Sequence, residues 1–130
     1  MNKIVVHGND GSISKGHSSD FTPMIPYFHL ATLEEPADSV KFWLENLKAV
    51  FIVMDFDGDP LHKDSHDFKK APFLGRHIVV NFRDGEKFYG ISELSHRDST
   101  GFYIFPGDPD SNTIRAYVLR SAIASVDIAN

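Results

Sequence analysis

The chain opens with a stretch that returns 74 residues later. Residues 4–16 and 78–90 agree at six of thirteen aligned positions, where composition alone would give roughly one. The agreements are an apolar strand, an Asp-Gly turn and a later glycine, all of which are folding signals. The repeat therefore predicts one small all-β unit that is written twice. In the first stretch the shared residues are Ile4, Val5, Val6, Asp10, Gly11 and Gly16.

The likeness continues downstream and sets the predicted domain organisation. Residues 1–56 and 75–130 look like diverged copies, and residues 57–74 form a linker between them. Each copy has about 55 residues, close to the lower limit for independent folding, so we expect the copies to pack on one another. The alignment matches 27–30 with 101–104 and then, with one residue inserted, 42–46 with 117–121 and 49–53 with 124–128.

Composition narrows the class of protein. The 42% hydrophobic content and eleven Phe suffice for a packed core, and the absence of cysteine excludes disulfides, thiolate metal sites and thiol nucleophiles. No segment resembles a signal peptide or reaches the length of a membrane span, so we expect a cytoplasmic protein. The net charge of −5, with no basic cluster beyond Lys69-Lys70, argues against nucleic-acid binding.

Short apolar segments separated by turn residues predict five strands in each copy. The Asp-Gly turns suit three-residue hairpin loops in which Gly11 and Gly85 adopt positive φ as G1 bulges. In this register Val80 faces Phe88 and Ile78 faces Gly90. Glycine inside a strand, as at Gly90, marks a bend or a close backbone approach. The remaining strands are expected at 27–33, 40–44 and 49–56 in the first copy and at 101–105, 114–119 and 123–128 in the second. Five short strands in about 50 residues predict a small barrel, and hence two tandem five-stranded barrels.

The second copy resembles the Sm and Sm-like small barrels, and SH3-like barrels share its strand–turn–strand pattern. The resemblance is carried by Gly75, Ile78, Val80, Phe82, Asp84, Gly85 and Gly90 as the first motif, and by 118–123 as the second. The segment 101–109 is similar to the Gly-Phe-x-x-Phe-Pro-x-Asp-Pro run of bacterial Sm-like proteins of unknown function. The resemblance implies a tandem Sm-like fold and oligomers that form through barrel edge strands.

The resemblance also suggests an alternative function. Sm-like RNA binders place an Asp and an Asn before the third strand and an Arg-Gly in the second motif. Here Asp98 stands for the Asp and Arg120 for the Arg, but no Asn follows Asp98 and Ser121 replaces the Gly. A shared fold does not imply a shared ligand. RNA binding therefore stays the alternative, and we expect no measurable affinity for RNA at physiological salt.

The candidate metal ligands lie in the linker and just before it. They are Asp55, Asp57, Asp59 and His62. An EF-hand loop needs Gly at its sixth position and Glu at its twelfth, and neither is found when the loop is counted from Asp55. A solvated, turn-forming joint is the favoured interpretation. We expect no cofactor and no catalytic residues, because Ser and Asp gather in turns here for structural reasons.

Phe42 and Trp43 are adjacent in the fourth strand of the first copy. Alternation points them to opposite faces, so one of them must leave the core of its barrel. These two residues form the predicted partner surface, either against the other copy or against a separate protein. The sequence as a whole predicts a non-enzymatic binding or assembly module of unknown ligand that associates with itself. A small enzyme or metal-dependent sensor that uses the Asp/His joint is a third interpretation.

Overall fold

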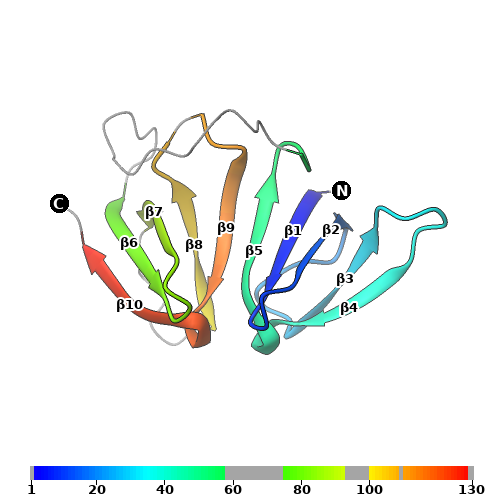
Figure 1. Ribbon diagram of the computed structural model, residues 1–130, viewed down its shortest axis with the longest axis horizontal. Coiled ribbons are helices and arrows are strands. Elements are labelled where there is room, and N and C mark those ends of the chain that lie inside the picture. The colour runs from blue at the N-terminus through cyan, green and yellow to red at the C-terminus, as the bar shows by residue number, and fades with distance from the viewer. Residues whose placement is uncertain (1, 58–74, 93–99, 109, 129–130) are drawn as a thin grey trace.

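The computed structural model describes residues 2–57, 75–92, 100–108 and 110–128 (Figure 1). These residues form ten strands and two short 3-10 turns, η1 (Leu44–Asn46) and η2 (Arg120–Ala122). The all-β prediction is therefore confirmed. In the described ranges no helix has the length and apolar character needed to cross a membrane. The strands are β1 (Asn2–Gly8), β2 (Ile13–Ser18), β3 (Tyr27–Thr32), β4 (Ser39–Trp43), β5 (Leu47–Val53), β6 (Arg76–Phe82), β7 (Lys87–Ser92), β8 (Gly101–Pro106), β9 (Thr113–Leu119) and β10 (Ile123–Ile128).

The strands make one ten-stranded antiparallel sheet rather than two closed barrels. Its order is β10-β6-β7-β8-β9-β5-β1-β2-β3-β4. The predicted closure does not occur, because closing either half needs a free edge on β5 or β9. Those two edges are hydrogen-bonded to each other instead. Figure 1 shows the result as two curled halves, with β5 and β9 side by side in the centre and β4 and β10 at the outer ends.

The hairpin turns follow the predicted geometry in both halves. Gly11 and Gly85 have φ of 88° and 94°. In the second half, Phe82 N–H donates to Glu86 O (2.8 Å) and Gly85 N–H donates to Phe82 O (3.0 Å). Val80 lies opposite Phe88, as predicted. In each three-residue loop the glycine has the positive φ that the turn needs, a backbone conformation that residues with a side chain rarely adopt.

Gly16 in β2 and Gly90 in β7 mark close approaches between neighbouring strands. A Cβ placed on Gly90 would lie 2.4 Å from Phe105 O, and one on Gly16 would lie 2.2 Å from Ala31 O. Both contacts are with backbone, which cannot move aside as a side chain can. The predicted close backbone approach is thus confirmed at both positions, and it allows β2 and β7 to meet the third strand of each half.

β5 is buried along its whole length because it belongs to two cores. Val50 and Ile52 pack with the first half, in a core that contains Ile4, Phe28 and Leu30. The alternate residues of β5 point to the other face and join the core of the second half. That set is Ala49, Phe51 and Val53. A strand buried on both faces explains the unbroken apolar run at 49–54.

β9 also contributes side chains to both cores. Its residues Ala116 and Val118 pack in the core of their own half, whereas Tyr117 and Leu119 pack in the core of the first half. The two halves therefore share a core boundary along the β5–β9 pair. We call this pair the junction.

The sequence alignment of the two halves needs one correction. In the first half Phe28 pairs with Phe42, and in the second Phe102 pairs with Val118. The pairing thus matches Phe42 with Val118, one residue beyond the Tyr117 that residue similarity suggested. A shift of one residue moves every side chain of a strand to the opposite face, so the pairing and not the similarity identifies the matching faces.

Candidate functional site

A cavity of about 610 Å³ lies at the end of the junction where η1 and η2 are found. Its walls come from both halves. We call it the junction cavity. It is lined by Pro23, Met24, Pro26, Trp43, Leu44, Glu45, Thr100, Leu119, Arg120 and Ser121. The volume falls in the range of small-molecule sites, about 300–1,000 Å³.

The same local structure supplies each side of the cavity. The fourth strand of each half ends in a 3-10 turn, and the first residue of that turn is tied to the start of the third strand. Leu44 N–H donates to Pro26 O (2.9 Å), and Arg120 N–H donates to Thr100 O (2.9 Å). Two corresponding turns therefore face each other across the cavity.

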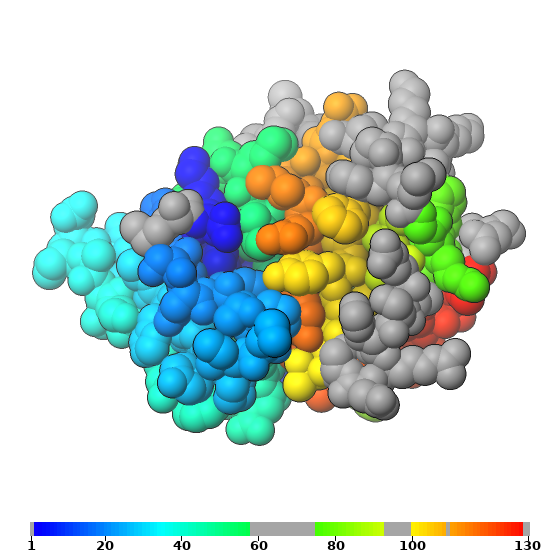
Figure 2. Space-filling model, turned by 180° about the vertical axis from the view of Figure 1, so that it is seen from behind, coloured from blue at the N-terminus to red at the C-terminus, as the bar shows by residue number. Residues whose placement is uncertain are grey.

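The segment before β3 forms a further wall. Seen from behind, residues of this segment lie against β8 and β9 of the other half (Figure 2). The ring of Phe21 makes edge contacts with Phe28 (5.0 Å between centroids) and Tyr117 (6.3 Å). These contacts anchor the segment beside the cavity, while Met24 at its tip is 90% exposed. An exposed apolar side chain beside a cavity is available to a ligand.

The predicted partner surface divides between two roles. Phe42 turns inward and stacks on Phe28 at 5.8 Å. Trp43 points the other way and is 42% exposed, which confirms the predicted alternation. Its indole lies 5.2 Å from the Tyr27 ring, and Lys41 Nζ lies 4.5 Å from the indole centroid. Trp43 therefore forms a cavity wall with a defined orientation.

The two residues of the RNA alternative have different outcomes. Arg120 lines the junction cavity, half-buried, with its guanidinium 5.3 Å from the centre of the Phe102 ring. Asp98 lies outside the described residues. The structure thus brings together Arg120 and Trp43, which the sequence assigned to separate roles.

The predicted metal residues are only partly described. Asp59 and His62 lie outside the described residues. Asp55 is hydrogen-bonded to Asn112, the residue before β9. The backbone N–H of Asp55 donates to Asn112 Oδ1 (3.0 Å), and its carbonyl accepts from Asn112 Nδ2 (2.8 Å). Its carboxylate accepts from Asp57 N–H (3.3 Å). Among the residues described, no three His, Asp or Glu side chains are grouped so that they could hold a metal ion.

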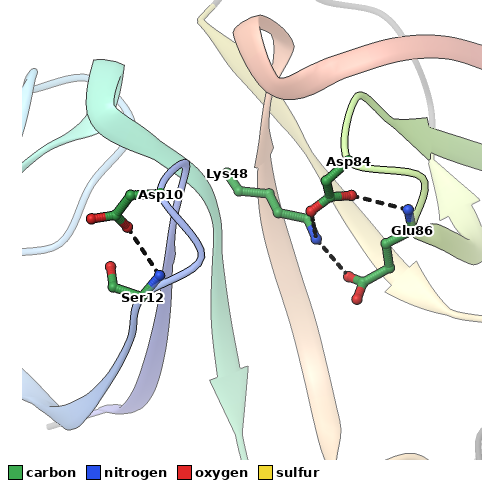
Figure 3. Close-up of polar contacts among 5 residues, drawn as sticks. All are labelled: Asp10, Ser12, Lys48, Asp84 and Glu86. Atoms are coloured by element: carbon green, nitrogen blue, oxygen red, sulfur yellow. Dashed lines mark hydrogen bonds and ion pairs between the residues drawn. The ribbon is translucent and has the colours of Figure 1, made fainter.

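A buried lysine crosses the junction near the cavity (Figure 3). Lys48 Nζ, from β5, lies 2.7 Å from Asp84 Oδ2 and 2.9 Å from Glu86 Oε1 in the β6–β7 turn. The hydrogen bond from Lys48 lowers the pKa of Asp84. Burial lowers the pKa of Lys48, but its bonds to Asp84 and Glu86 outweigh burial, so that pKa is raised. The cluster fixes the two halves relative to each other beside the cavity.

One polar pair was not predicted from the sequence. His29 Nδ1 lies 2.8 Å from Asp20 Oδ2, and this bond lowers the pKa of Asp20. Ser18 Oγ donates to Asp20 Oδ1 (3.0 Å). The serine and the histidine thus share the carboxylate instead of contacting one another, so the order needed to activate a serine nucleophile is not formed.

Sequence reasoning also missed most of the cavity wall. Pro23, Met24 and Pro26 belong to the loop before β3, where the sequence shows only a run of proline and apolar residues at 23–26. Leu119 appeared to be an ordinary strand residue. Their common role depends on how the two halves meet, which periodicity within one half does not report.

Comparison with curated proteins finds no match, and comparison with solved structures finds none. A family model does match, over residues 1–130. The all-β chain with its junction cavity belongs to the family of unknown function DUF6982.

Proposed function

We propose that this protein is a non-enzymatic binding and assembly module, built from two diverged Sm-like units and able to associate with itself. The observation that carries the proposal is the junction, where the fifth strand of one half pairs with the fourth strand of the other. A surface that joins two similar halves within one chain is suited to join separate chains as well.

Matching registers support the duplication. Each first strand pairs with the second and fifth strands of its own half, and each third strand pairs with the second and fourth. The paired positions correspond at a spacing of 74 residues in the first three strands and 76 in the last two. The register pairs are Ile4 with Gly16 and Ile52, then Ile78 with Gly90 and Ile128, and Leu30 with Val40, then Ile104 with Ala116.

The outer strands β4 and β10 stand at the ends of the sheet, each with one paired neighbour among the described strands. They correspond to β9 and β5, the strands that form the junction. An unpaired edge is a template for pairing with another chain. Transferring the junction register places Asp127 of one chain opposite Val40 of the next, as Phe51 lies opposite Ala116.

The outer edges are more polar than the junction. Ser125 and Asp127 on β10 take the places of Ala49 and Phe51 on β5, and Lys41 on β4 takes the place of Tyr117. Inward or edge charges weaken strand pairing between chains. Association should therefore be reversible and weaker than the contact between the halves.

Cross-linking tests this register directly, because the chain has no native cysteine. Asp127→Cys and Val40→Cys proteins are mixed under mild oxidation, and disulfide-linked dimers are measured on non-reducing gels. The matched control replaces Val40→Cys by Lys41→Cys, which lies on the opposite face of the same strand. Preferential linking to position 40 supports the proposal. Equal linking, or no linking at concentrations where sedimentation detects dimers, contradicts it, and a strict monomer at high concentration contradicts self-association.

RNA binding is the second candidate, favoured by the meeting of Trp43 and Arg120 in one cavity. An aromatic side chain that stacks a base and an arginine that contacts phosphate are usual parts of single-strand sites. The charge of −5 opposes it. Titration of labelled oligo-U and oligo-A at low and physiological salt tests it. Micromolar binding at low salt that Arg120→Ala abolishes would favour RNA over assembly.

A further inference from the structure

We infer that the junction cavity binds a small uncharged molecule whose body is one or two apolar rings. The cavity is built from the two halves of a single chain, so this binding needs no second copy and goes beyond self-association. Four features of the wall carry the inference. They are its apolar side chains, its ordered tryptophan, its occupied hydrogen-bonding groups and the state of its two charged residues.

The walls favour an apolar body. Leu44 and Leu119, one from each half, are each only 2% exposed, so core packing holds them in place in the wall. Met24 is 90% exposed, and its flexible side chain can adapt to the shape of a bound molecule. A cavity of about 610 Å³ has room for one or two rings with short substituents. Such a ligand would remove apolar surface from water on both sides of the contact.

Trp43 is positioned before any ligand arrives. Tyr27 packs against its ring, and Lys41 Nζ lies over both rings, 4.1 Å from the Tyr27 centroid and 4.5 Å from the Trp43 centroid. A ring that is already ordered loses little conformational freedom when a ligand packs on it. The indole therefore offers a preformed surface for an apolar ring.

Several hydrogen-bonding groups of the wall are already used within the chain. The N–H of Leu44 donates to Pro26 O (2.9 Å), and that of Arg120 donates to Thr100 O (2.9 Å). The hydroxyl of Thr100 lies 3.0 Å from that of Tyr117. A ligand rich in polar groups would give up hydrogen bonds to water and find few replacements here, whereas an apolar ring has none to give up.

The two charged residues of the wall do not select an ion. Glu45 is exposed, so water screens its carboxylate. The opposite charge, on Arg120, is already engaged within the chain, with the guanidinium 5.3 Å from the Phe102 centroid among its interactions. An ion that left water for this cavity would lose hydration without a dedicated opposite charge to replace it. The cavity therefore favours an uncharged ligand.

The chain supplies its own reporter, because Trp43 is its single tryptophan. The probe is the uncharged 4-tert-butylbenzyl alcohol, and the matched ions of the same shape are 4-tert-butylbenzoate and 4-tert-butylbenzylamine. Emission of Trp43, excited at a wavelength that tyrosine does not absorb, is followed during titration of the whole chain. We expect a blue shift with a dissociation constant on the order of 1 mM or tighter for the alcohol. Both ions should bind at least about fivefold more weakly.

A pair of methionine variants tests the site by fluorescence. Met24→Ser should weaken the alcohol about two- to fivefold, because it removes an apolar contact. Met54→Ser is the matched control, since Met54 is also exposed (57%) but does not line the cavity, and it should leave the affinity unchanged. Urea unfolding of each variant establishes that it is folded.

A second readout does not depend on the tryptophan. A ligand that binds only the folded chain raises the urea midpoint, which circular dichroism follows. The alcohol should raise this midpoint in the wild type and clearly less in Trp43→Leu. Phe56→Leu is the control, because it replaces an aromatic ring outside the cavity wall and should keep the full rise.

The outcomes are distinct from those of the assembly test. Tighter binding of the benzoate or of the benzylamine would overturn the choice of an uncharged ligand. No shift of Trp43 emission up to about 10 mM alcohol, or equal weakening in Met24→Ser and Met54→Ser, would overturn the site. An affinity that falls when the protein is diluted about tenfold would place the site between copies and contradict a cavity within one chain. Selective weakening in Met24→Ser and Trp43→Leu at unchanged affinity on dilution supports the inference.

Discussion

Lys48 Nζ lies 2.7 Å from Asp84 Oδ2, across the junction between the two halves of the chain. The lysine side chain is 9% exposed, whereas that of Asp84 is 55% exposed. A buried ammonium that leaves its strand to meet carboxylates on a turn of the other half couples the two halves at one point. The Phe82 ring, 4.6 Å from the same nitrogen, covers it from the side.

We predict that Lys48→Met lowers the free energy of unfolding by about 1 kcal/mol. The substitution keeps the apolar stem but removes two charge-assisted hydrogen bonds, whose carboxylate ends are screened by water. Urea unfolding measures the change. Lys41→Met is the control, because Lys41 is exposed and contacts only ring faces in the described structure, and it should cost about half as much or less. An unchanged midpoint in Lys48→Met would show that the junction does not depend on this cluster.

His7 should make stability depend on pH between neutral and mildly acidic conditions. Burial has the largest effect on its pKa and lowers it; Lys48 lowers it further, whereas Glu86 and Asp84 raise it by less than burial lowers it. Because the folded pKa lies below the unfolded value of 6.5, the folded protein prefers neutral His7. The corresponding stability is present above pH 6.5 and is lost as the pH falls through the folded pKa.

The measurement is the urea midpoint between pH 7.5 and 5. In His7→Phe, which keeps a ring beside Phe51 (4.6 Å between centroids in the wild type), the fall over this window should be smaller than in the wild type. The fall in His7→Phe is also compared with that in His17→Phe, which replaces a histidine on the neighbouring strand β2. An equal fall in the wild type and His7→Phe would contradict the assignment.

Gly85→Val should destabilise the protein by about 1–3 kcal/mol through backbone strain. The reason is its φ of 94°, since a Cβ at this position would meet no atom within 4 Å. Gly85→Asn is the matched variant, because asparagine tolerates the left-handed region, and it should cost clearly less than valine. Thermal or urea unfolding decides between them. Equal costs would indicate that the side chain, and not φ, is the problem.

Phe51→Ala should lower the free energy of unfolding by about 3–5 kcal/mol. Phe51 is in the first half of the chain, but its ring packs in the core of the second half. Unfolding followed by Trp43 fluorescence, which reports the first half, and by far-ultraviolet circular dichroism, which reports both, should shift together in this variant. Separate midpoints for the two signals would mean that the halves unfold independently.

Local signals determined much of the fold in advance. The Asp-Gly turns set positive φ at Gly11 and Gly85, and the alternation of apolar residues placed nearly all ten strands. Alternation also separated Phe42 from Trp43 correctly. Such features depend on neighbours within a few residues, because steric limits on φ and the two-residue period of a strand act over that distance.

Only the tertiary structure decided how the halves join. Strand edges present the same backbone N–H and C=O groups in every sequence. The local sequence pattern therefore does not predict that β5 pairs with β9 instead of closing a barrel. The pairings of β3 with β4 and of β8 with β9 corrected the alignment by one residue, since register is set by which faces are buried. The pairing of β5 with β9 also created the junction cavity, where Trp43 meets Arg120 from the far half of the chain. The sequence alone determined the strands and turns of each half, whereas the site arose from a long-range pairing that those local rules leave open.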